Sequence, residues 1–99
     1  MINTFESVKV LSCDQVTDLT ADFKLTNGNS FHILIAPGDT ADKVEGQVLP
    51  VSMKLAKNDT SKNIPVVVGD WNPLVVESID ASAIDLTQYD VYISEIADY

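Results

Sequence analysis

Residues 64–79 read Ile-Pro-Val-Val-Val-Gly-Asp-Trp-Asn-Pro-Leu-Val-Val-Glu-Ser-Ile, and this stretch decides the fold class. Its two apolar runs, residues 66–68 and 74–76, flank the connection 69–73, which carries the only tryptophan of the chain. Runs of valine and isoleucine bounded by glycine, asparagine and proline are typical of β-strands joined by a turn. We therefore expect Trp71 at or near the tip of a hairpin or at a corner of a β-sandwich.

A second hairpin is predicted upstream of this stretch. Residues 19–25 alternate between apolar and polar side chains, and so do residues 31–36. Asn27-Gly28 lies between them, and this dipeptide between two alternating runs is the strongest short-range hairpin signal. We therefore predict that residues 19–25 and 31–36 pair directly with each other.

Three further segments are predicted to be strands. Residues 5–12 and 89–96 alternate, the latter with Tyr89, Val91 and Ile93 on one face. The run 44–55 changes parity at Pro50, which predicts a β-bulge or an edge position there. The polar stretch 57–63 is expected to be an exposed loop.

The segments together predict an all-β fold. About seven short strands, spaced roughly 8–12 residues apart with turn signals between them, are typical of an antiparallel β-sandwich or barrel. At most one or two short helical turns are expected, at residues 40–45 and 80–86, where Thr40 and Asp80 or Ser82 could cap them. A length of 99 residues indicates a single domain, residues 1–99.

The charge balance excludes whole classes of partner. The chain has 15 acidic residues, 6 lysines and no arginine, which gives a formal net charge of −9. Such a surface repels DNA, RNA and anionic membranes, and the missing arginine removes the best side chain for binding phosphate. We expect no nucleic-acid partner. No apolar run approaches membrane-spanning length, so we expect no membrane partner either.

No motif for catalysis is present, so we predict that the protein is not an enzyme. The single cysteine, Cys13, has no partner in the chain for a disulfide and is expected to be a small buried hydrophobe in the first strand. The single histidine, His32, lies on a predicted strand without any linked nucleophile, so a partly buried or surface strand histidine is the expected role. The first five residues lack the features of a signal peptide, so we expect the chain to be made and assembled in a reducing cytoplasm.

No cofactor and no metal site are predicted. Asp39, Asp42 and Glu45 offer hard oxygen ligands that lie close together in the sequence. Their spacing misses the calcium-loop pattern, and acidic loops are usually only solvated. A structural calcium ion at these three residues remains the alternative.

Binding through shape is the remaining class of function. Aromatic side chains combine a large apolar area with a polar tip and are therefore suited to anchor an interface. For Trp71, a contact role and a role as a lid over the core both remain open. The predicted interface residues are Trp71, Asn72, Pro73, Tyr89, Tyr92 and Tyr99.

Residues 66–68 form an apolar run, and Gly69 begins a turn that leads to Pro73. Residues 74–76 lead on to Ile79-Asp80-Ala81-Ser82, and a last apolar run follows at residues 91–93. This layout of residues 65–93 resembles small all-β structural proteins of tailed-phage particles, of the head auxiliary (decoration) or spike-base type. Those chains combine a strand, a glycine-containing turn leading to a proline, an alternating strand that ends near Ile-x-Ala-Ser, and a final strand. The turn rich in glycine and threonine that follows Ala-Ser in those families is missing here.

The resemblance implies a virion component assembled in the host cytoplasm, and it implies no site residues. Together with the absence of catalytic motifs, it leads us to expect a non-enzymatic structural or interaction protein. Its partners would be other protein subunits, in a homo-oligomer or a larger assembly. The alternative is a carbohydrate-binding or adhesive β-sandwich, in which Trp71 and a tyrosine stack on sugar rings.

Overall fold

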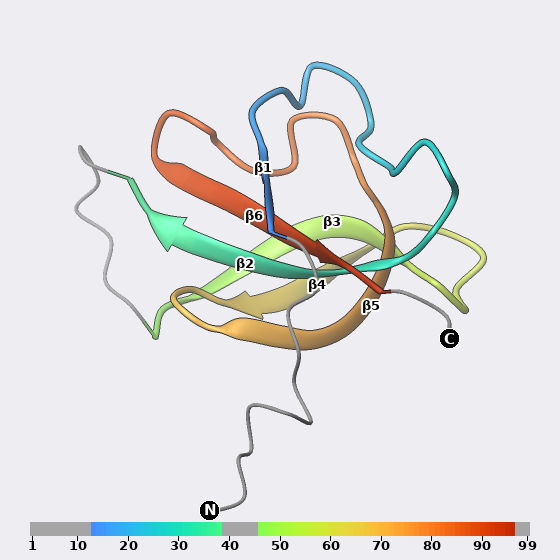
Figure 1. Ribbon diagram of the computed structural model, residues 1–99. Coiled ribbons are helices and arrows are strands. Elements are labelled where there is room, and N and C mark those ends of the chain that lie inside the picture. The colour runs from blue at the N-terminus through green and yellow to red at the C-terminus, as the bar shows by residue number, and fades with distance from the viewer. Residues whose placement is uncertain (1–12, 39–45, 97–99) are drawn as a thin grey trace, which may run out of the picture.

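The structure, a computed structural model, describes residues 13–38 and 46–96. Six strands form a single sheet in the spatial order β1-β6-β2-β5-β3-β4, and every neighbouring pair is antiparallel (Figure 1). No helix occurs within these two ranges. The predicted all-β, antiparallel fold is confirmed. The strands are β1 (Asp14–Val16), β2 (Phe31–Pro37), β3 (Val48–Leu55), β4 (Lys62–Val67), β5 (Trp71–Ile79) and β6 (Tyr89–Glu95).

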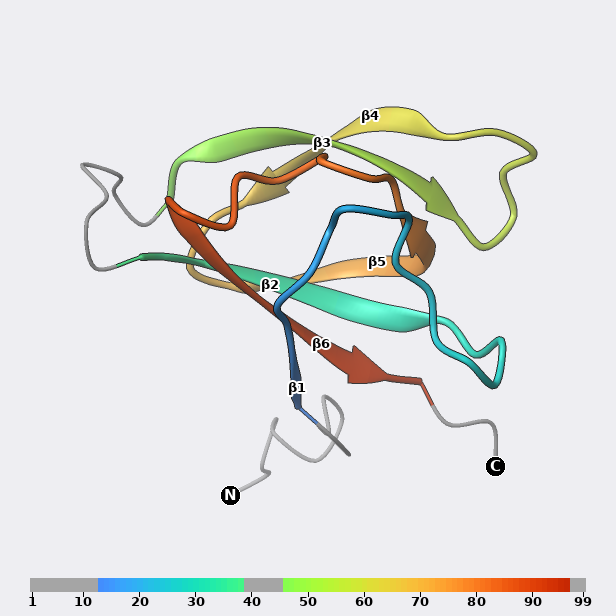
Figure 2. The same ribbon diagram turned by 90° about the horizontal axis from the view of Figure 1, so that it is seen from above.

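The sheet is strongly curled, so its two ends face each other. β1, β6 and β2 lie on one side of the molecule, and β3 and β4 lie on the other (Figure 2). β5 joins the two sides, because its start pairs with β2 and its end pairs with β3. Beyond the end of β4, Val68 forms a parallel bridge with Ile35, and the Gly69 N–H donates to the Ile35 carbonyl at 2.8 Å. The end of β4 therefore returns to β2.

One hydrophobic core fills the space between the two sides. The alternation of β2 and β6 places one parity of each strand inside. Tyr89, Val91 and Ile93 share one face, as predicted, and it is the inner face. Phe23 covers the core near β2, where its ring meets that of Phe31 edge to face at 5.5 Å. The buried apolar residues are Val16, Leu19, Phe31, Ile33, Ile35, Val51, Met53, Val66, Val68, Val76, Ile79, Ile84, Tyr89, Val91 and Ile93.

The predicted hairpin between residues 19–25 and 31–36 is wrong. A turn does form at Asn27-Gly28, where the Gly28 N–H donates to the Leu25 carbonyl at 3.0 Å. β2, however, pairs with β6 on one edge and β5 on the other, so no edge remains for residues 19–25. Their only bridge is from Phe23 to Ile79. The local turn signal was correct, but two distant strands compete successfully for β2.

Trp71 does not lie at the tip of a hairpin. β4 and β5 are consecutive in the chain, yet β3 lies between them in the sheet. The connection 68–70 is therefore a corner, and Trp71 is already the first residue of β5.

The bulge predicted at Pro50 is also wrong. Pro50 pairs in unbroken register with Pro65, and the irregularity of β3 lies between Lys54 and Leu55, where β3 faces β5. Pro50 does lie outside the stretch of β3 that pairs with β5, so its missing N–H leaves no gap in that ladder.

Several smaller predictions can be compared with the structure. Lys62 and Asn63 belong to β4 rather than to the preceding loop, and residues 80–86 form turns rather than a helix. Cys13 is exposed just before β1, so the expected buried position is wrong. The described residues do not include the segments 5–12 and 40–45, the residues Asp39, Asp42 and Glu45, or Tyr99. No helix long and apolar enough to span a membrane occurs in the part of the chain that is described.

Candidate functional site

The sheet register brings Trp71 and Tyr92 onto one face. Trp71 of β5 pairs with Leu34 of β2, and Leu34 pairs in turn with Tyr92 of β6. Directly opposite residues in a sheet project from the same face, and the neighbouring Ile33 and Ile35 point into the core. Trp71, Leu34 and Tyr92 therefore form a lateral row on the outer face, and each is half-buried.

The row continues along β5 as an exposed apolar strip. Pro73 and Val75 share the outward parity of Trp71, and both are exposed, Val75 by 44%. We call Trp71, Leu34, Tyr92, Pro73 and Val75 the Trp71 face. A shallow groove of about 360 Å³ adjoins its β5 end and is lined by Leu55, Ala56, Lys57, Asn58, Pro73, Leu74 and Val75.

Two of the predicted interface residues are interior. Tyr89 is 5% exposed and belongs to the core, and Asn72 is 6% exposed. The Asn72 amide accepts from the Val67 N–H at 2.9 Å and donates to the carbonyls of Val67 and Asp70 at 3.1 and 3.0 Å. Asn72 therefore holds the corner between β4 and β5, and neither it nor Tyr89 is available to a partner.

His32 lies on the outer face of β2, two residues from Leu34. Its Nδ1 lies 2.8 Å from the Leu74 carbonyl oxygen, and because a carbonyl can only accept, Nδ1–H is the donor. The imidazole thus ties β2 to the irregular stretch of β5, where the register shifts. This contact supports the shape of the Trp71 face and gives His32 a positioning role.

Charges of both signs border the Trp71 face. Asp90 shares the outward parity of Tyr92 and lies opposite Ala36. Glu77 of β5 is paired with Lys54 at 2.7 Å, and Lys57 lines the groove beside Val75. The face is therefore apolar, and no single sign of charge dominates its rim.

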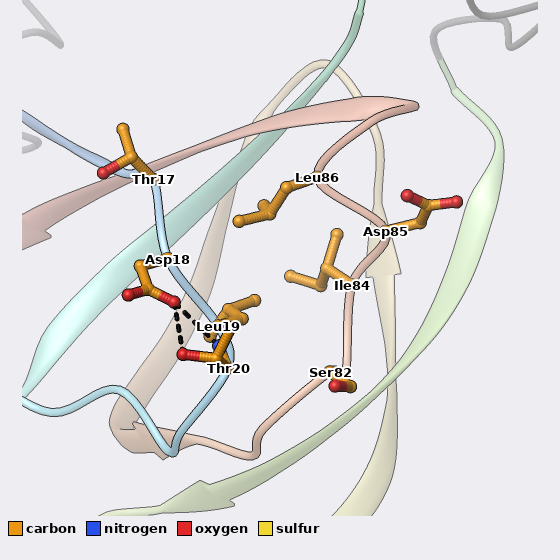
Figure 3. A pocket seen from close by; sticks show the side chains of 8 residues that line it. All are labelled: Thr17, Asp18, Leu19, Thr20, Ser82, Ile84, Asp85 and Leu86. Atoms are coloured by element: carbon orange, nitrogen blue, oxygen red, sulfur yellow. Dashed lines mark hydrogen bonds between the residues drawn. The ribbon is translucent and has the colours of Figure 1, made fainter.

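A second hollow, of about 420 Å³, opens beside β1 (Figure 3). Two copies of the tripeptide Asp-Leu-Thr contribute to it, residues 18–20 and 85–87. In each copy the aspartate accepts the N–H and the Oγ1–H of its own threonine, at 2.8 and 2.7 Å in the first copy and at 3.0 and 2.6 Å in the second. The residues that line the hollow are Thr17, Asp18, Leu19, Thr20, Ser82, Ile84, Asp85 and Leu86.

The hollow lies between two turns that pack together through apolar side chains. Figure 3 shows Leu19, Ile84 and Leu86 between the two turns, with the carboxylate of Asp18 directed at Thr20. The backbone N–H and the hydroxyl of Thr20 lower the pKa of Asp18 below its ordinary value of 3.8. The residues that line the hollow include no histidine or cysteine.

The described residues hold no cluster that suits a metal ion. Within residues 13–38 and 46–96, no group of three or more histidine, cysteine, aspartate or glutamate side chains lies close enough to share one. Asp80 accepts hydrogen bonds from the hydroxyls of Ser52 and Ser61, which ties the end of β5 to the β3–β4 hairpin.

Sequence reasoning identified Trp71, Pro73 and Tyr92 but missed two parts of the site. Leu34, the centre of the row, follows the ordinary alternation of β2, and only the strand order makes it a neighbour of Trp71. The repeated Asp-Leu-Thr was visible in the sequence, although a three-residue match is too short to predict that both copies border one hollow. Comparison of the chain with protein-family models, with curated proteins and with solved structures gives no match, so the site is defined by its geometry.

Proposed function

We propose that this protein is a non-enzymatic structural or interaction protein that binds another protein subunit through the Trp71 face. The observation that carries the proposal is the row Trp71–Leu34–Tyr92, which places two half-buried aromatic residues on one outer face of the sheet. Tryptophan and tyrosine are enriched among the residues that contribute most of the binding energy of protein interfaces. The exposed Pro73 and Val75 extend the patch along β5.

The setting that we propose is a virion or a comparable particle in which many copies of the chain are arranged together. This part of the proposal is supported by the resemblance of residues 65–93 to structural proteins of tailed phages. It is also supported by the position of the Trp71 face on strands rather than on loops, because strands present an interface in one fixed shape.

The single tryptophan gives a direct test, because its fluorescence reports on the face itself. We expect the mean mass from light scattering to rise with protein concentration, while quenching of Trp71 by acrylamide falls in parallel. Trp71→Ala and Tyr92→Ala should each weaken association at least about tenfold, as is usual for aromatic interface anchors. Thr60→Ala, in an exposed loop, is the matched control and should change nothing.

A carbohydrate ligand is the second candidate, because Trp71 and Tyr92 share a face and lie two strands apart, roughly 10 Å at the usual strand spacing. A lone monomer at every concentration that binds a glycan, and loses that binding with Trp71→Ala, would replace the assembly proposal with this one. Association that persists unchanged in both aromatic variants would also contradict the proposed role of the face.

A further inference from the structure

The turn at residues 26–29 contains the one Asn-Gly dipeptide of the chain, Asn27-Gly28. The hairpin that this dipeptide predicts does not form, so the turn joins no pair of neighbouring strands. All four residues of the turn are exposed, and a Cβ atom added at Gly28 would meet nothing within 4 Å. Water therefore has open access to the Asn27 amide and to the backbone of Gly28.

The order of these two residues makes Asn27 chemically labile. Asparagine loses its side-chain amide when the backbone nitrogen of the following residue attacks the side-chain carbon. Glycine hinders that attack least, because it has no Cβ and its backbone adopts many conformations. Among the asparagines of the chain, only Asn27 precedes glycine.

The structure fixes the orientation of the Asn27 amide through two contacts. Its Oδ1 accepts the Asn29 N–H at 2.9 Å, and its Nδ2 donates to the Glu95 carboxylate at 2.9 Å. The Asn29 N–H lies where negative charge develops on Oδ1 during attack, and a donor at such a position lowers the barrier. The Gly28 N–H donates to the Leu25 carbonyl at 3.0 Å, so attack requires that this exposed bond open first.

The same amide attaches the turn to the end of β6. The Nδ2 groups of Asn27 and Asn29 both donate to Oε2 of Glu95. Hydrogen bonds to a charged acceptor are stronger than those between neutral groups. Directly beyond them, the Ile96 N–H donates to the Ser30 carbonyl at 2.9 Å. The amides therefore help to hold the end of β6 against the segment that leads into β2.

We propose that Asn27 is a site of spontaneous deamidation, and that the carboxylate formed there detaches the turn 26–29 from Glu95. The only co-reactant is water, and the inference does not depend on the Trp71 face. The fraction of molecules with a detached turn then rises with the age of the protein.

The reaction has two steps. The Gly28 nitrogen forms a bond to Cγ of Asn27, and its proton leaves with the side-chain NH₂ group as ammonia. Water then opens the resulting five-membered imide, adding its hydroxyl to one carbonyl carbon and its proton to the ring nitrogen. Opening at Cγ gives aspartate, and opening at the backbone carbonyl gives isoaspartate.

The product cannot keep the contact with Glu95. In aspartate, one oxygen can still accept the Asn29 N–H, but the other replaces the Nδ2 that donates to Glu95. Two carboxylates at this separation repel each other, and the donor is lost. In isoaspartate the backbone is also one carbon longer, which disturbs the bond from Gly28 to Leu25.

The effect should stay local, because the segment before the turn has its own attachment. Phe23 and Ile79 exchange two backbone hydrogen bonds, at 2.8 and 2.9 Å. The Phe23 ring also packs edge to face on Phe31 of the core. We therefore expect the turn and the end of β6 to loosen while the sheet remains folded.

The first experiment follows the reaction itself. The full chain is incubated at mildly alkaline pH, and the peptides that contain Asn27, Asn58 and Asn63 are compared over time by mass spectrometry. Asn27 should convert first, to a mixture of aspartate and isoaspartate that chromatography separates. A sample unfolded in urea shows that the conditions suffice, and Asn27→Gln should lose the converted species because its longer side chain does not close the same ring.

The second experiment measures the detachment by amide hydrogen exchange. Asn27→Asp should speed exchange at Ile96 about tenfold, because a hydrogen bond to a charged group contributes local stability of that order. Exchange at Phe23 and Ile79 should stay as in the unaltered chain, which also shows that the variant is folded. Asn63→Asp makes the same change of charge at an exposed position of β4 and should leave Ile96 unaffected.

Two results would overturn the inference. If Asn27 persists as asparagine in the folded chain while it converts in urea, the turn protects the amide and the assigned site is wrong. If Asn27→Asp exchanges at Ile96 at the rate of the unaltered chain, the amide does not hold the turn on β6. Neither result bears on association through the Trp71 face, which is tested separately.

Discussion

The side chain of Asn72 hydrogen-bonds both backbone groups of Val67, with its Oδ1 2.9 Å from the Val67 nitrogen and its Nδ2 3.1 Å from the Val67 oxygen. An asparagine amide thus occupies the place that a neighbouring strand would take at the end of β4. The same Nδ2 also donates to Asp70 and, at 3.4 Å, to Ile33. One side chain therefore connects β4, the corner and β2.

Replacing Asn72 should destabilise the fold strongly. We expect Asn72→Ala to lower the free energy of unfolding by about 2–3 kcal/mol, because it leaves several partly buried backbone groups without partners. Asn72→Asp keeps the acceptor for Val67 but loses every donor, so it should cost at least as much at neutral pH. Urea denaturation measures both. Asn63→Ala, at an exposed position of β4, is the control and should change stability by less than about 0.5 kcal/mol.

Neighbouring residues of β6 should differ sharply in their effect on stability. Ile93 is fully buried, so Ile93→Ala should cost about 2–5 kcal/mol through lost burial and the cavity left behind. Tyr92 projects from the opposite face and is half-buried, so Tyr92→Ala should cost only about 1 kcal/mol. Thermal or urea unfolding distinguishes the two. Equal costs would mean that the Trp71 face is part of the core.

Asp18 should titrate below its ordinary value of 3.8, because the N–H and the hydroxyl of Thr20 stabilise its charged form. A carboxyl whose pKa is lower in the folded state contributes stability that is present above the unfolded value and is lost as the pH falls through the folded value. NMR titration of the Asp18 carboxyl measures the shift. Thr20→Val removes the hydroxyl and keeps the N–H, so the pKa should rise part of the way back. An unchanged pKa in that variant would assign the whole shift to the backbone.

Pro65 should protect the free edge of β4. Pro65→Val adds an N–H that faces outward from this edge, together with a side chain of high β-propensity. We expect the variant to aggregate faster on mild heating, measured by turbidity and thioflavin T fluorescence. Thr60→Val is the control, because it adds the same side chain in an exposed loop outside any strand. Equal aggregation of the two variants would show that edge position is not the cause.

The sequence pattern predicted the fold class and which residues of a strand share a face, because both depend on local alternation. β6 shows this well: Tyr89, Val91 and Ile93 share one face, as predicted, and the structure shows that this face is the buried one. The same local information failed for residues 19–25, which alternate like a strand but find no free edge to pair with. The partners of β2 depend on which distant segments pair with it most favourably, and no single window of the sequence contains that information.

For the candidate site, too, the sequence predicted the residue types but not which residues lie together. Trp71 and Tyr92 were identified as aromatic residues suited to an interface, and the strand order supplied the fact that they share a face. Asn72 and Tyr89 were grouped with them by sequence proximity and by residue type. Their burial follows from strand parity at Asn72 and from core packing at Tyr89, which sequence composition does not reveal.

The strand order also determines when the fold can form. β3 with β4 is the only neighbouring pair in the sheet that is consecutive in the chain, and β6 lies between β1 and β2. A nascent chain on the ribosome therefore holds β1 without a neighbour, and leaves one edge of β2 open, until residues 89–95 have emerged. Tyr92 completes the row with Leu34 and Trp71 only at that stage. Subunits that recognise one another through this row can thus begin to associate only after nearly all of these 99 residues have been translated.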